Sequence, residues 1–458
     1  MNLDRRRFAL ALAALGATPL AAAQTLDDDL VHAALLRERG LADTLAYSLI
    51  ESLVTEVGAR PAGSASNARA VQWALAQLRR LGFAKVRADE VSFSIWQRGA
   101  ESAQLTAPYA HRLTLLGLGN TVPTPDGGIE AEVAWYPDLE ALRSDTSERA
   151  RGRIVVIDQK TERSRDGSGY GRAIGMRTGG AVEAARHGAV ALVIRSLATD
   201  HDRFAHTGSM RYEPSVPRIP AAAMSVPDAD LIARLHERGR PVSLRLALAS
   251  RQVDARSHNV IAEVPGTDLA GEIVQLGAHL DSWDVGHGAV DDGAGIGIAT
   301  AAAKLLLDSG RRPRRTVRLV LFANEENGFD GANGYAERYK DEPHQLVSES
   351  DFGAGRIWRL RSRVRPEALE RIALIGRALA PLGIEPAGND ASPSPDAGVL
   401  MRRRQWPALE LTQDGSDYFD VHHTENDTLD KVDAKALPQN VAAWAVAAWL
   451  AAQSDVRF

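Results

Sequence analysis

The sequence predicts an α/β protein with a mixed, mostly parallel sheet sandwiched between helices. Two observations predict it. In the second half, apolar strand-like segments at residues 273–278 and 316–323 flank a glycine-rich helical segment at residues 291–308, an alternation typical of such sheets. The composition, 45% hydrophobic and 25% charged, is that of an ordinary globular protein. At about 150 residues per domain, 458 residues are enough for two or three domains.

The first predicted element of the chain is an amphipathic helix over residues 66–81. Val71, Leu75 and Leu78 recur at helical spacing, and Gly82 follows where the helix should stop. This pattern predicts a surface helix with one apolar face.

The middle of the chain predicts a small α/β unit of its own. Strands are expected at residues 152–158 and 189–194, helices at 181–186 and 227–237, and an alternating strand at 242–248. The Pro/Gly-rich stretch 120–128 and the polar stretch 250–257 are expected to bound this unit. The following elements, residues 273–278, 291–308 and 316–323, belong to the main sheet.

Charge and cysteine content exclude several classes of protein. With 54 Lys and Arg against 59 Asp and Glu, the net charge is −5, whereas nucleic-acid binding usually needs a strongly basic face. There is no cysteine, so a metal site must use His, Asp and Glu.

The N-terminal residues 1–23 are expected to be an export signal. Three arginines (Arg5 to Arg7) and Phe8 precede a weakly apolar run that ends in the small residues Ala21 to Ala23. The arginines resemble a twin-arginine signal, although a Sec signal stays open. The run is too short to span a bilayer. We therefore expect a periplasmic or secreted mature protein that begins near Gln24 and has no membrane anchor.

Polar residues gather where the predicted strands end. Ligands of open α/β sheets bind outside the carboxyl ends of the strands, and two hydrolytic metal ions need several carboxylates and imidazoles there. The candidates lie after strand ends, at the start of the glycine-rich turn or in the C-terminal His-His pair: His279, Asp281, Asp291, Asp292, Glu325, Glu326, Asp351, His422 and His423.

These motifs together resemble metallopeptidase family 28. The resemblance rests on His279-x-Asp281, Val290-Asp291-Asp292-Gly293-Ala294-Gly295, Glu325-Glu326, Glu349-Ser350-Asp351 and His422-His423-x-x-x-Asp427-Thr428, and on an entry segment over residues 58–64. It implies a zinc-exopeptidase fold over residues 24–117 and 253–458, with a protease-associated domain inserted at 118–252.

The resemblance also implies a site with two zinc ions. His279 and Asp351 would bind one zinc, Glu326 and His423 the other, and Asp291 would bridge them. Glu325 matches the catalytic base, and Asp281 matches the residue that orients His279. Manganese or cobalt could replace zinc on such ligands.

The expected function is metal-dependent exopeptidase action on dipeptides or short peptides, through a bridging water and Glu325. His422 could donate a hydrogen bond to the tetrahedral oxyanion. An aminopeptidase for longer peptides, a glutaminyl cyclase and a binding protein without activity remain alternatives. A homodimer is compatible with the sequence, which determines neither the side-chain preference nor the oligomeric state.

Several conspicuous residues are placed outside the site. The arginine run 311–315 is expected to be a solvated loop, and Trp444 and Trp449 are expected to pack in the core. His187, His201 and His206 in the middle unit are expected to bind no metal.

Overall fold

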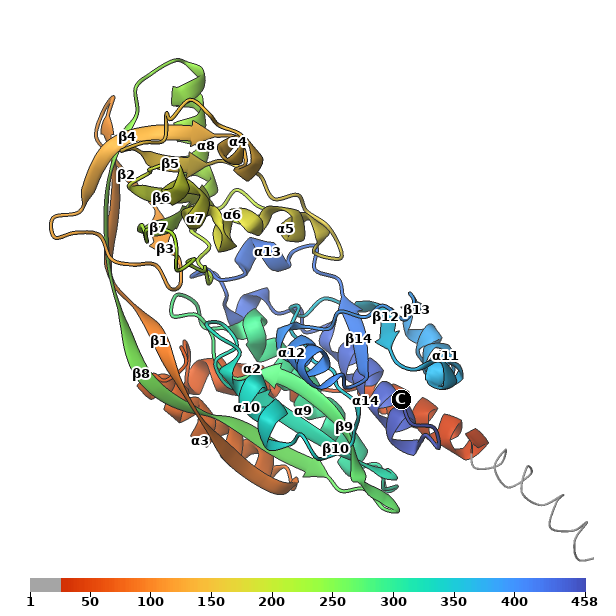
Figure 1. The fold of residues 1–458 in the computed structure, drawn as a ribbon. Coiled ribbons are helices and arrows are strands. Elements are labelled where there is room, and N and C mark those ends of the chain that lie inside the picture. Colours follow the sequence, from red (N-terminus) through yellow and green to blue (C-terminus); the bar gives the residue numbers. More distant parts are fainter. Residues whose placement is uncertain (1–25) are drawn as a thin grey trace, which may run out of the picture.

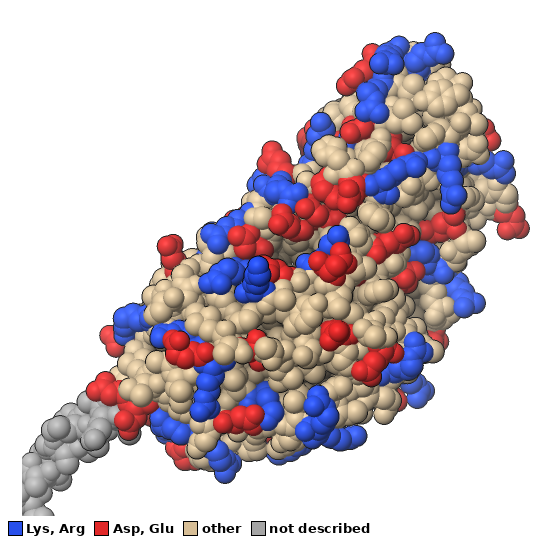
Figure 2. Space-filling view, turned by 180° about the vertical axis from the view of Figure 1, so that it is seen from behind, with Lys and Arg blue, Asp and Glu red and all other residues tan. Residues whose placement is uncertain are grey.

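The computed structural model describes residues 26–458, so the predicted export signal at residues 1–23 lies outside the described residues. Figure 1 shows an elongated molecule with a small lobe at one end, residues 111–248, and a large lobe formed by the other described residues. No helix of the described residues is long and apolar enough to cross a membrane. On the face seen in Figure 2, basic and acidic side chains are interspersed.

Two long strands join the lobes. β1 (Ala84–Ala107) and β8 (Ser243–Val264) pair antiparallel from Ala84 opposite Glu263 to Ala107 opposite Ser243, and both run along one side of the molecule (Figure 1). The polar stretch 250–257, expected to bound the middle unit, is therefore strand and not linker. Between the lobes this ribbon is partly exposed on both faces, so its polar residues are compatible with a strand.

The main sheet of the large lobe has the order β11-β9-β10-β8. β9 (Leu269–His279) pairs parallel with β10 (Arg315–Phe322) and β11 (His344–Leu346), and β10 pairs antiparallel with β8. The strands predicted at 273–278 and 316–323 are thus present, and the predicted fold class is confirmed.

Helices cover both faces of this sheet. On one face, Val317, Leu319 and Leu321 of β10 pack in a core with α2 (Leu45–Glu56), α3 (Ala65–Arg80), α9 (Ala294–Leu307) and α14 (Leu437–Gln453). On the other face, Val320 and Phe322 pack with α10 (Asp330–Arg338) and α12 (Pro395–Arg404). Alternate residues of one strand therefore face two separate cores.

The N-terminal and C-terminal helices behave as the sequence predicts. The Ser64 hydroxyl accepts a hydrogen bond from Asn67 N at 3.0 Å and caps α3, and Gly82 takes a positive φ of 84° directly after it. Trp444 and Trp449 of α14 are fully buried, as expected.

One expectation about the arginine run is wrong. Arg315 is 1% exposed and begins β10, and its guanidinium donates to Glu272 at 2.7 Å and to the carbonyls of Ala451 and Ser454. An arginine can be buried when acceptors surround it, and those acceptors come from segments far away in sequence.

The small lobe has an α/β arrangement with its own cores on the two sheet faces. Its strands are β2 (His111–Leu113), β3 (Leu115–Gly117), β4 (Ile129–Tyr136), β5 (Ile154–Ile157), β6 (Ala191–Arg195) and β7 (Ala221–Met224), and its helices are α4 (Leu139–Arg143), α5 (Ser168–Ala173), α6 (Gly175–Thr178), α7 (Gly180–Arg186) and α8 (Val226–Glu237). The elements predicted in this part are present. Domain boundaries at residues 118 and 252 remain a prediction.

The remaining elements complete the large lobe. A helix over residues 26–41 precedes α2, and a kinked turn, Ala289–Gly293, in which Asp291 and Asp292 have non-helical backbone angles, precedes α9. A three-stranded sheet contains β12 (Ile357–Arg363), β13 (Glu385–Pro386) and β14 (Ala408–Gln413); α11 (Leu369–Leu379), α13 (Tyr418–Val421) and 3₁₀ turns at Pro366–Ala368, Ala380–Leu382 and Leu429–Lys431 make up the rest.

Candidate active site

The candidate residues meet at the carboxyl ends of the parallel strands. His279 is the last residue of β9 and lies opposite Phe322, the last residue of β10. Glu325 and Glu326 follow β10, and Asp351 follows a parallel bridge between Gly277 and Glu349. Because these strands are parallel, their ends bring residues from three segments to one edge of the sheet.

Asp291 lies at the centre of the cluster. Its Oδ1 is 3.0 Å from His279 Nε2, and its Oδ2 is 3.2 Å from His423 Nε2. Each imidazole faces a second carboxylate, since His279 Nε2 is 3.6 Å from Asp351 Oδ1 and His423 Nε2 is 3.1 Å from Glu326 Oε2. The five residues that the resemblance implies as ligands thus form two groups around one shared carboxylate.

Main-chain hydrogen bonds fix the segment that carries Asp291. The Asp427 carboxylate accepts from Val290 N at 2.7 Å and from Asp291 N at 3.1 Å. Asp292 accepts from His279 N at 3.0 Å and from Gly295 N at 3.0 Å. The turn is therefore connected to β9, to α9 and to the segment after His423.

Asp281 contacts the cluster through both its main chain and its side chain. Its carbonyl oxygen is 3.1 Å from His279 Nδ1, whereas its carboxylate is 3.8 Å away. The carboxylate accepts from Glu325 N at 3.1 Å and from Glu326 N at 3.4 Å. Asp281 therefore positions His279 mainly through its carbonyl, and it positions the two glutamates through its side chain.

Glu325 and His422 lie beside the five central residues. A carboxylate oxygen of Glu325 falls within 4.8 Å of ligand atoms of His279 and Glu326. The His422 ring stacks on the His423 ring with centroids 3.5 Å apart, and its Nε2 lies 3.7 Å from Asp291 Oδ2. Burial and the neighbouring His423 hold the pKa of His422 well below its usual value, so its ring is neutral.

The cluster contains more carboxyl groups than imidazole groups. Burial and mutual repulsion raise the pKa values of Glu325, Glu326, Asp351 and Asp292, and raise that of Glu349 to about 8. Glu326 Oε1 is buried without a hydrogen-bond partner. Buried carboxylates in this number need positive charge, and oxygen and imidazole ligands suit zinc, manganese or cobalt. The residues present therefore fit a cationic centre.

Arg60 is a structural residue that the sequence did not single out as part of the site. It is fully buried and donates to the carbonyls of Leu280 (2.8 Å), His287 (2.8 Å) and Gly288 (2.9 Å). These carbonyls lie on the segment between His279 and Asp291.

The small lobe contacts the cluster directly. The carbonyl oxygen of Thr207 is 3.3 Å from His423 Nδ1, and Thr207 N donates to His423 O at 3.2 Å. Ser209 Oγ donates to Glu326 O at 2.5 Å. These contacts hold His423 with Nε2 toward the carboxylates, as a histidine ligand requires, and nothing in the sequence predicted them.

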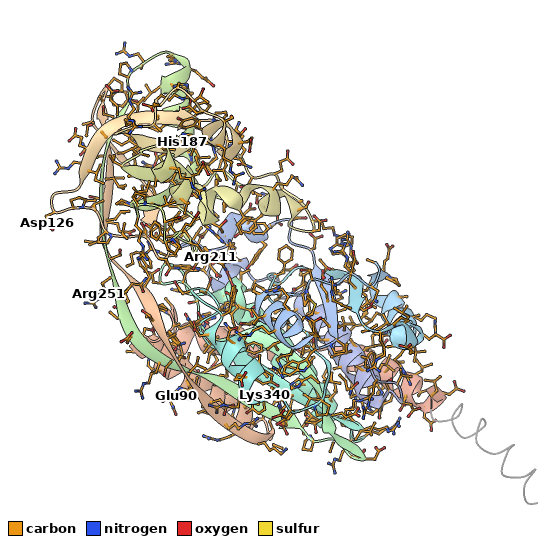
Figure 3. All side chains as sticks on the ribbon, viewed as in Figure 1. Glu90, Asp126, His187, Arg211, Arg251 and Lys340 are labelled. Atoms are coloured by element: carbon orange, nitrogen blue, oxygen red, sulfur yellow. The ribbon has the colours of Figure 1, made fainter. Side chains whose placement is uncertain are left out.

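Two histidines of the small lobe are not grouped with the candidate ligands, although His206 lies close to His422 and His423. His206 is buried with Nδ1 unpaired, and burial lowers its pKa to about 3. His187 faces Glu183 at 3.4 Å on α7, in the small lobe (Figure 3). Neither is grouped with carboxylates that could hold a metal among the described residues.

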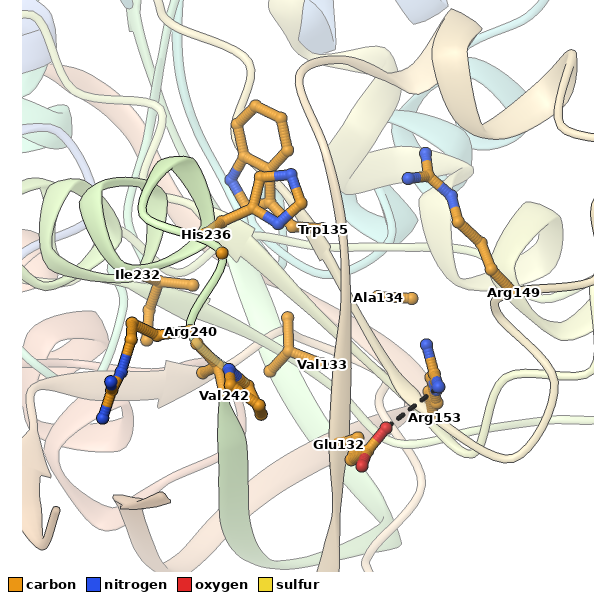
Figure 4. A pocket seen from close by; sticks show the side chains of 12 residues that line it. Glu132, Val133, Ala134, Trp135, Arg149, Arg153, Ile232, His236, Arg240 and Val242 are labelled. Atoms are coloured by element: carbon orange, nitrogen blue, oxygen red, sulfur yellow. Dashed lines mark ion pairs between the residues drawn. The ribbon is translucent and has the colours of Figure 1, made fainter. Parts of the chain in front are cut away.

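A cleft of about 950 Å³ opens onto the cluster between the two lobes. Asp291, Glu325, Glu326 and His423 line one wall, and Tyr170, Arg177 and Met210 of the small lobe line another. A second hollow of about 310 Å³ lies between β4 and α8, where Trp135 stacks on His236 and Glu132 pairs with Arg153 at 2.9 Å (Figure 4). Of these two hollows, the cleft is the one lined by the cluster, so it is the candidate active site.

Known proteins are similar in sequence to this chain, including the segment that carries the cluster. The model of peptidase family M28 matches residues 259–448. Carboxypeptidase Q of Mus musculus is 36% identical over 89% of this chain and 86% of its own length. Human carboxypeptidase Q is 36% identical over 91% and 87%. The chain belongs to peptidase family M28.

Solved structures agree with the membership in family M28. An M28 peptidase precursor from Shewanella amazonensis is 46% identical, covers 94% of this chain and 98% of its own, and superposes with a TM-score of 0.91. A zinc aminopeptidase from Bacillus subtilis, 17% identical over 88% of this chain and 93% of its own, shares the fold with a TM-score of 0.63. The M28 chain described here is thus a metallo-exopeptidase.

Proposed function

We propose that this M28 peptidase hydrolyses dipeptides or short peptides with two zinc ions held by its cluster. The observation that supports this most is the position of Asp291, whose two oxygens face two different imidazoles at 3.0 and 3.2 Å. One zinc would take His279 and Asp351, the other Glu326 and His423, and Asp291 would bridge them. Bound zinc would polarise the scissile carbonyl and make water acidic enough to attack near neutral pH.

Glu325 is the proton carrier of the proposed reaction. Its backbone is fixed by Asp281, and its carboxylate lies within 4.8 Å of ligand atoms of His279 and Glu326. The family resemblance gives the ligand roles to the five other residues and leaves Glu325 free to act as the base. It accepts a proton from the attacking water and returns it to the leaving amine. Burial raises the pKa of Glu325 well above its usual value, which favours a base that can also release its proton as an acid.

His422 is proposed to stabilise the oxyanion that forms during peptide hydrolysis. Its neutral ring lines the cleft beside Asp291. A neutral imidazole can donate one N–H to a developing negative charge in a water-poor site. The His423 ring stacked against it fixes its orientation.

The test combines metal analysis with a peptide panel. Elemental analysis of the purified mature enzyme should give about two zinc ions per chain. Unblocked dipeptides should be cleaved, and a chelator should abolish cleavage. Hydrolysis of long peptides at equal kcat/KM would favour the aminopeptidase alternative, and full activity in metal-free protein would overturn the proposal.

Export is proposed from the first 23 residues. Fusion of residues 1–30 to a reporter that is active only outside the cytoplasm should give signal, and Arg6→Lys with Arg7→Lys should remove it if the twin-arginine route is used.

A further inference from the structure

Arg177 is a buried arginine without an acidic partner. It lies on α6 of the small lobe and is 7% exposed. Its Nη1 donates to Thr207 O at 3.5 Å, and its Nε has no hydrogen-bond partner. In the described part of the chain it forms no ion pair, unlike the buried Arg195, which pairs with Asp158 at 2.7 Å. A buried guanidinium of this kind is costly unless an anion joins it.

The Arg177 guanidinium lies close to the proposed zinc ligands. Thr207 O, which accepts from Arg177 Nη1, is also the oxygen next to His423 Nδ1. The guanidinium lies 5.6 Å from the centre of the Tyr170 ring, which in turn meets the His422 ring edge-on. Arg177 therefore lines the cleft, and a single main-chain oxygen, that of Thr207, lies between its guanidinium and His423.

The backbone around Arg177 leaves room for the guanidinium. Gly208 has a φ of +136°, and a Cβ at this position would collide with the Nη1, Cζ and Nε atoms of Arg177. A glycine here keeps one face of the guanidinium against the main chain. The side chain is thus held in place before any ligand binds, which lowers the entropic cost of binding one.

The two walls of the cleft carry opposite charge. The large-lobe wall holds Glu325, Glu326 and Asp351, whereas the small-lobe wall contributes Arg177 and Arg211 beside one acid, Asp166. A substrate with a free carboxylate suits such a cleft, with that group toward an arginine of the small-lobe wall. Arg211, labelled in Figure 3, lines the same cleft but is exposed, so water weakens its attraction for an anion.

We propose that Arg177 binds the free C-terminal carboxylate of the substrate and so selects dipeptides. This rests on the proposed peptidase function of the cluster. A guanidinium offers two parallel N–H donors to a carboxylate. In a dipeptide that carboxylate is one residue away from the scissile carbonyl. Arg177 lies at a comparably short range from the proposed metal site, because Thr207 O contacts both its guanidinium and His423.

The experiment compares two substrates that differ in one group. The zinc-loaded enzyme is given Ala-Ala and Ala-Ala amide, and kcat/KM is measured for each. In the parent enzyme we expect the free acid to be preferred, because the amide leaves Arg177 without its anion. In Arg177→Met the ratio of the two kcat/KM values should fall by roughly tenfold to a hundredfold, mainly through the KM of the free acid.

Two further variants separate recognition from structure. Arg177→Lys keeps the charge and should retain part of the preference for the free acid. Arg211→Met, in the same cleft but exposed, should change the ratio by no more than about threefold. Zinc content and melting temperature, measured for every variant, report any damage to the cluster or the fold.

The outcomes distinguish this inference from the proposed function. If the parent enzyme cleaves neither peptide, the proposed function fails. If it cleaves both equally well, if Arg177→Met lowers both kcat/KM values by the same factor, or if the preference follows Arg211 and not Arg177, the role of Arg177 is overturned while the peptidase function stands.

Discussion

Asp291 is the residue on which both halves of the cluster depend, because each of its oxygens faces a different imidazole. Glu325 lies beside His279 and Glu326, and the proposed reaction gives it the role of a proton carrier and not that of a ligand. The two carboxylates should therefore respond differently to substitution, although both are buried in the same site.

Glu325→Gln should lower kcat by about 10²–10⁴-fold and leave the zinc content near that of the parent. The amide is isosteric with the carboxylate but cannot carry the proton. Steady-state kinetics and elemental analysis of the same preparation check both parts.

Asp291→Ala is the contrasting variant. It should lose most of both metals together with activity, because the shared carboxylate is gone. If Glu325→Gln lost metal to the same extent as Asp291→Ala, or kept near-normal turnover, the roles given to these two residues would be wrong.

Arg60→Met should destabilise the protein by about 3–5 kcal/mol. The change removes a fully buried cation from among Asp427, Asp281 and Asp292 and leaves three carbonyls without their donors. Urea denaturation measures the loss, and Arg79→Ala, on the exposed face of α3, is the control, expected within about 0.5 kcal/mol. Equal stability of the two variants would show that Arg60 is not needed.

At the scale of elements, the start of α9 is packed without spare room against the end of the sheet. A Cβ at Gly295 would collide with the carbonyl oxygen of Ser350 and the carboxylate of Asp292. The sequence showed a Gly-Ala-Gly turn before a helix, and the structure shows why a glycine stands there: the helix approaches the segment that leads to Asp351.

Gly295→Ala should destabilise the protein by about 1–3 kcal/mol and lower zinc content, because the turn that carries Asp291 must shift. Chemical denaturation and elemental analysis check it. Gly171→Ala is the matched control, since this helical glycine of α5 has no atom within 4 Å of the added Cβ; it should be neutral or stabilise by up to about 1 kcal/mol. A neutral Gly295→Ala would contradict the close packing described.

The elements were predictable where periodicity is strong. Buried strands β9 and β10 and the amphipathic α3 carry their pattern in adjacent residues. The stretch 250–257 and Arg315 were assigned to loops because polar residues are usually solvated. The stretch 250–257 pairs with β1, and Arg315 contacts β9 and α14. The local sequence does not show these contacts.

At the scale of the whole molecule, the cluster couples folding to protons and metal. Burial raises the pKa of Glu349 to about 8 and that of Asp427 to about 7, whereas carboxyl groups of an unfolded chain titrate near 4. Without metal, these two groups, together with Glu325 and Asp292, whose pKa values are also raised, hold more protons in the folded state than in the unfolded state above about pH 4. This exceeds the opposite effect of the buried neutral His206 and His422, which is confined to pH values below about 6.5.

The free energy of unfolding of metal-free protein should fall as the pH rises from 5.5 to 8, with a slope on the order of 1 kcal/mol per pH unit. Urea titrations of chelator-treated protein at several pH values measure this. Zinc-loaded protein should show a smaller fall or none, since the cation stabilises the ionised carboxylates. Metal-free protein that gained stability over this range would refute the assignment of raised pKa values.

The sequence by itself determined the fold class, the family and the set of residues that meet at the strand ends. It could do so because strand periodicity is local and because residues after parallel strands share one edge of the sheet. Only the tertiary structure decided which atoms face Asp291, that Arg60 holds the loop between His279 and Asp291, and that Thr207 and Arg177 of the small lobe lie at the cluster. Most of these contacts join residues more than a hundred positions apart, or involve main-chain atoms that every residue has, so no sequence pattern marks them. The contact between His279 and Asp291 spans only 12 positions, but it depends on how the turn before α9 folds back onto the end of β9.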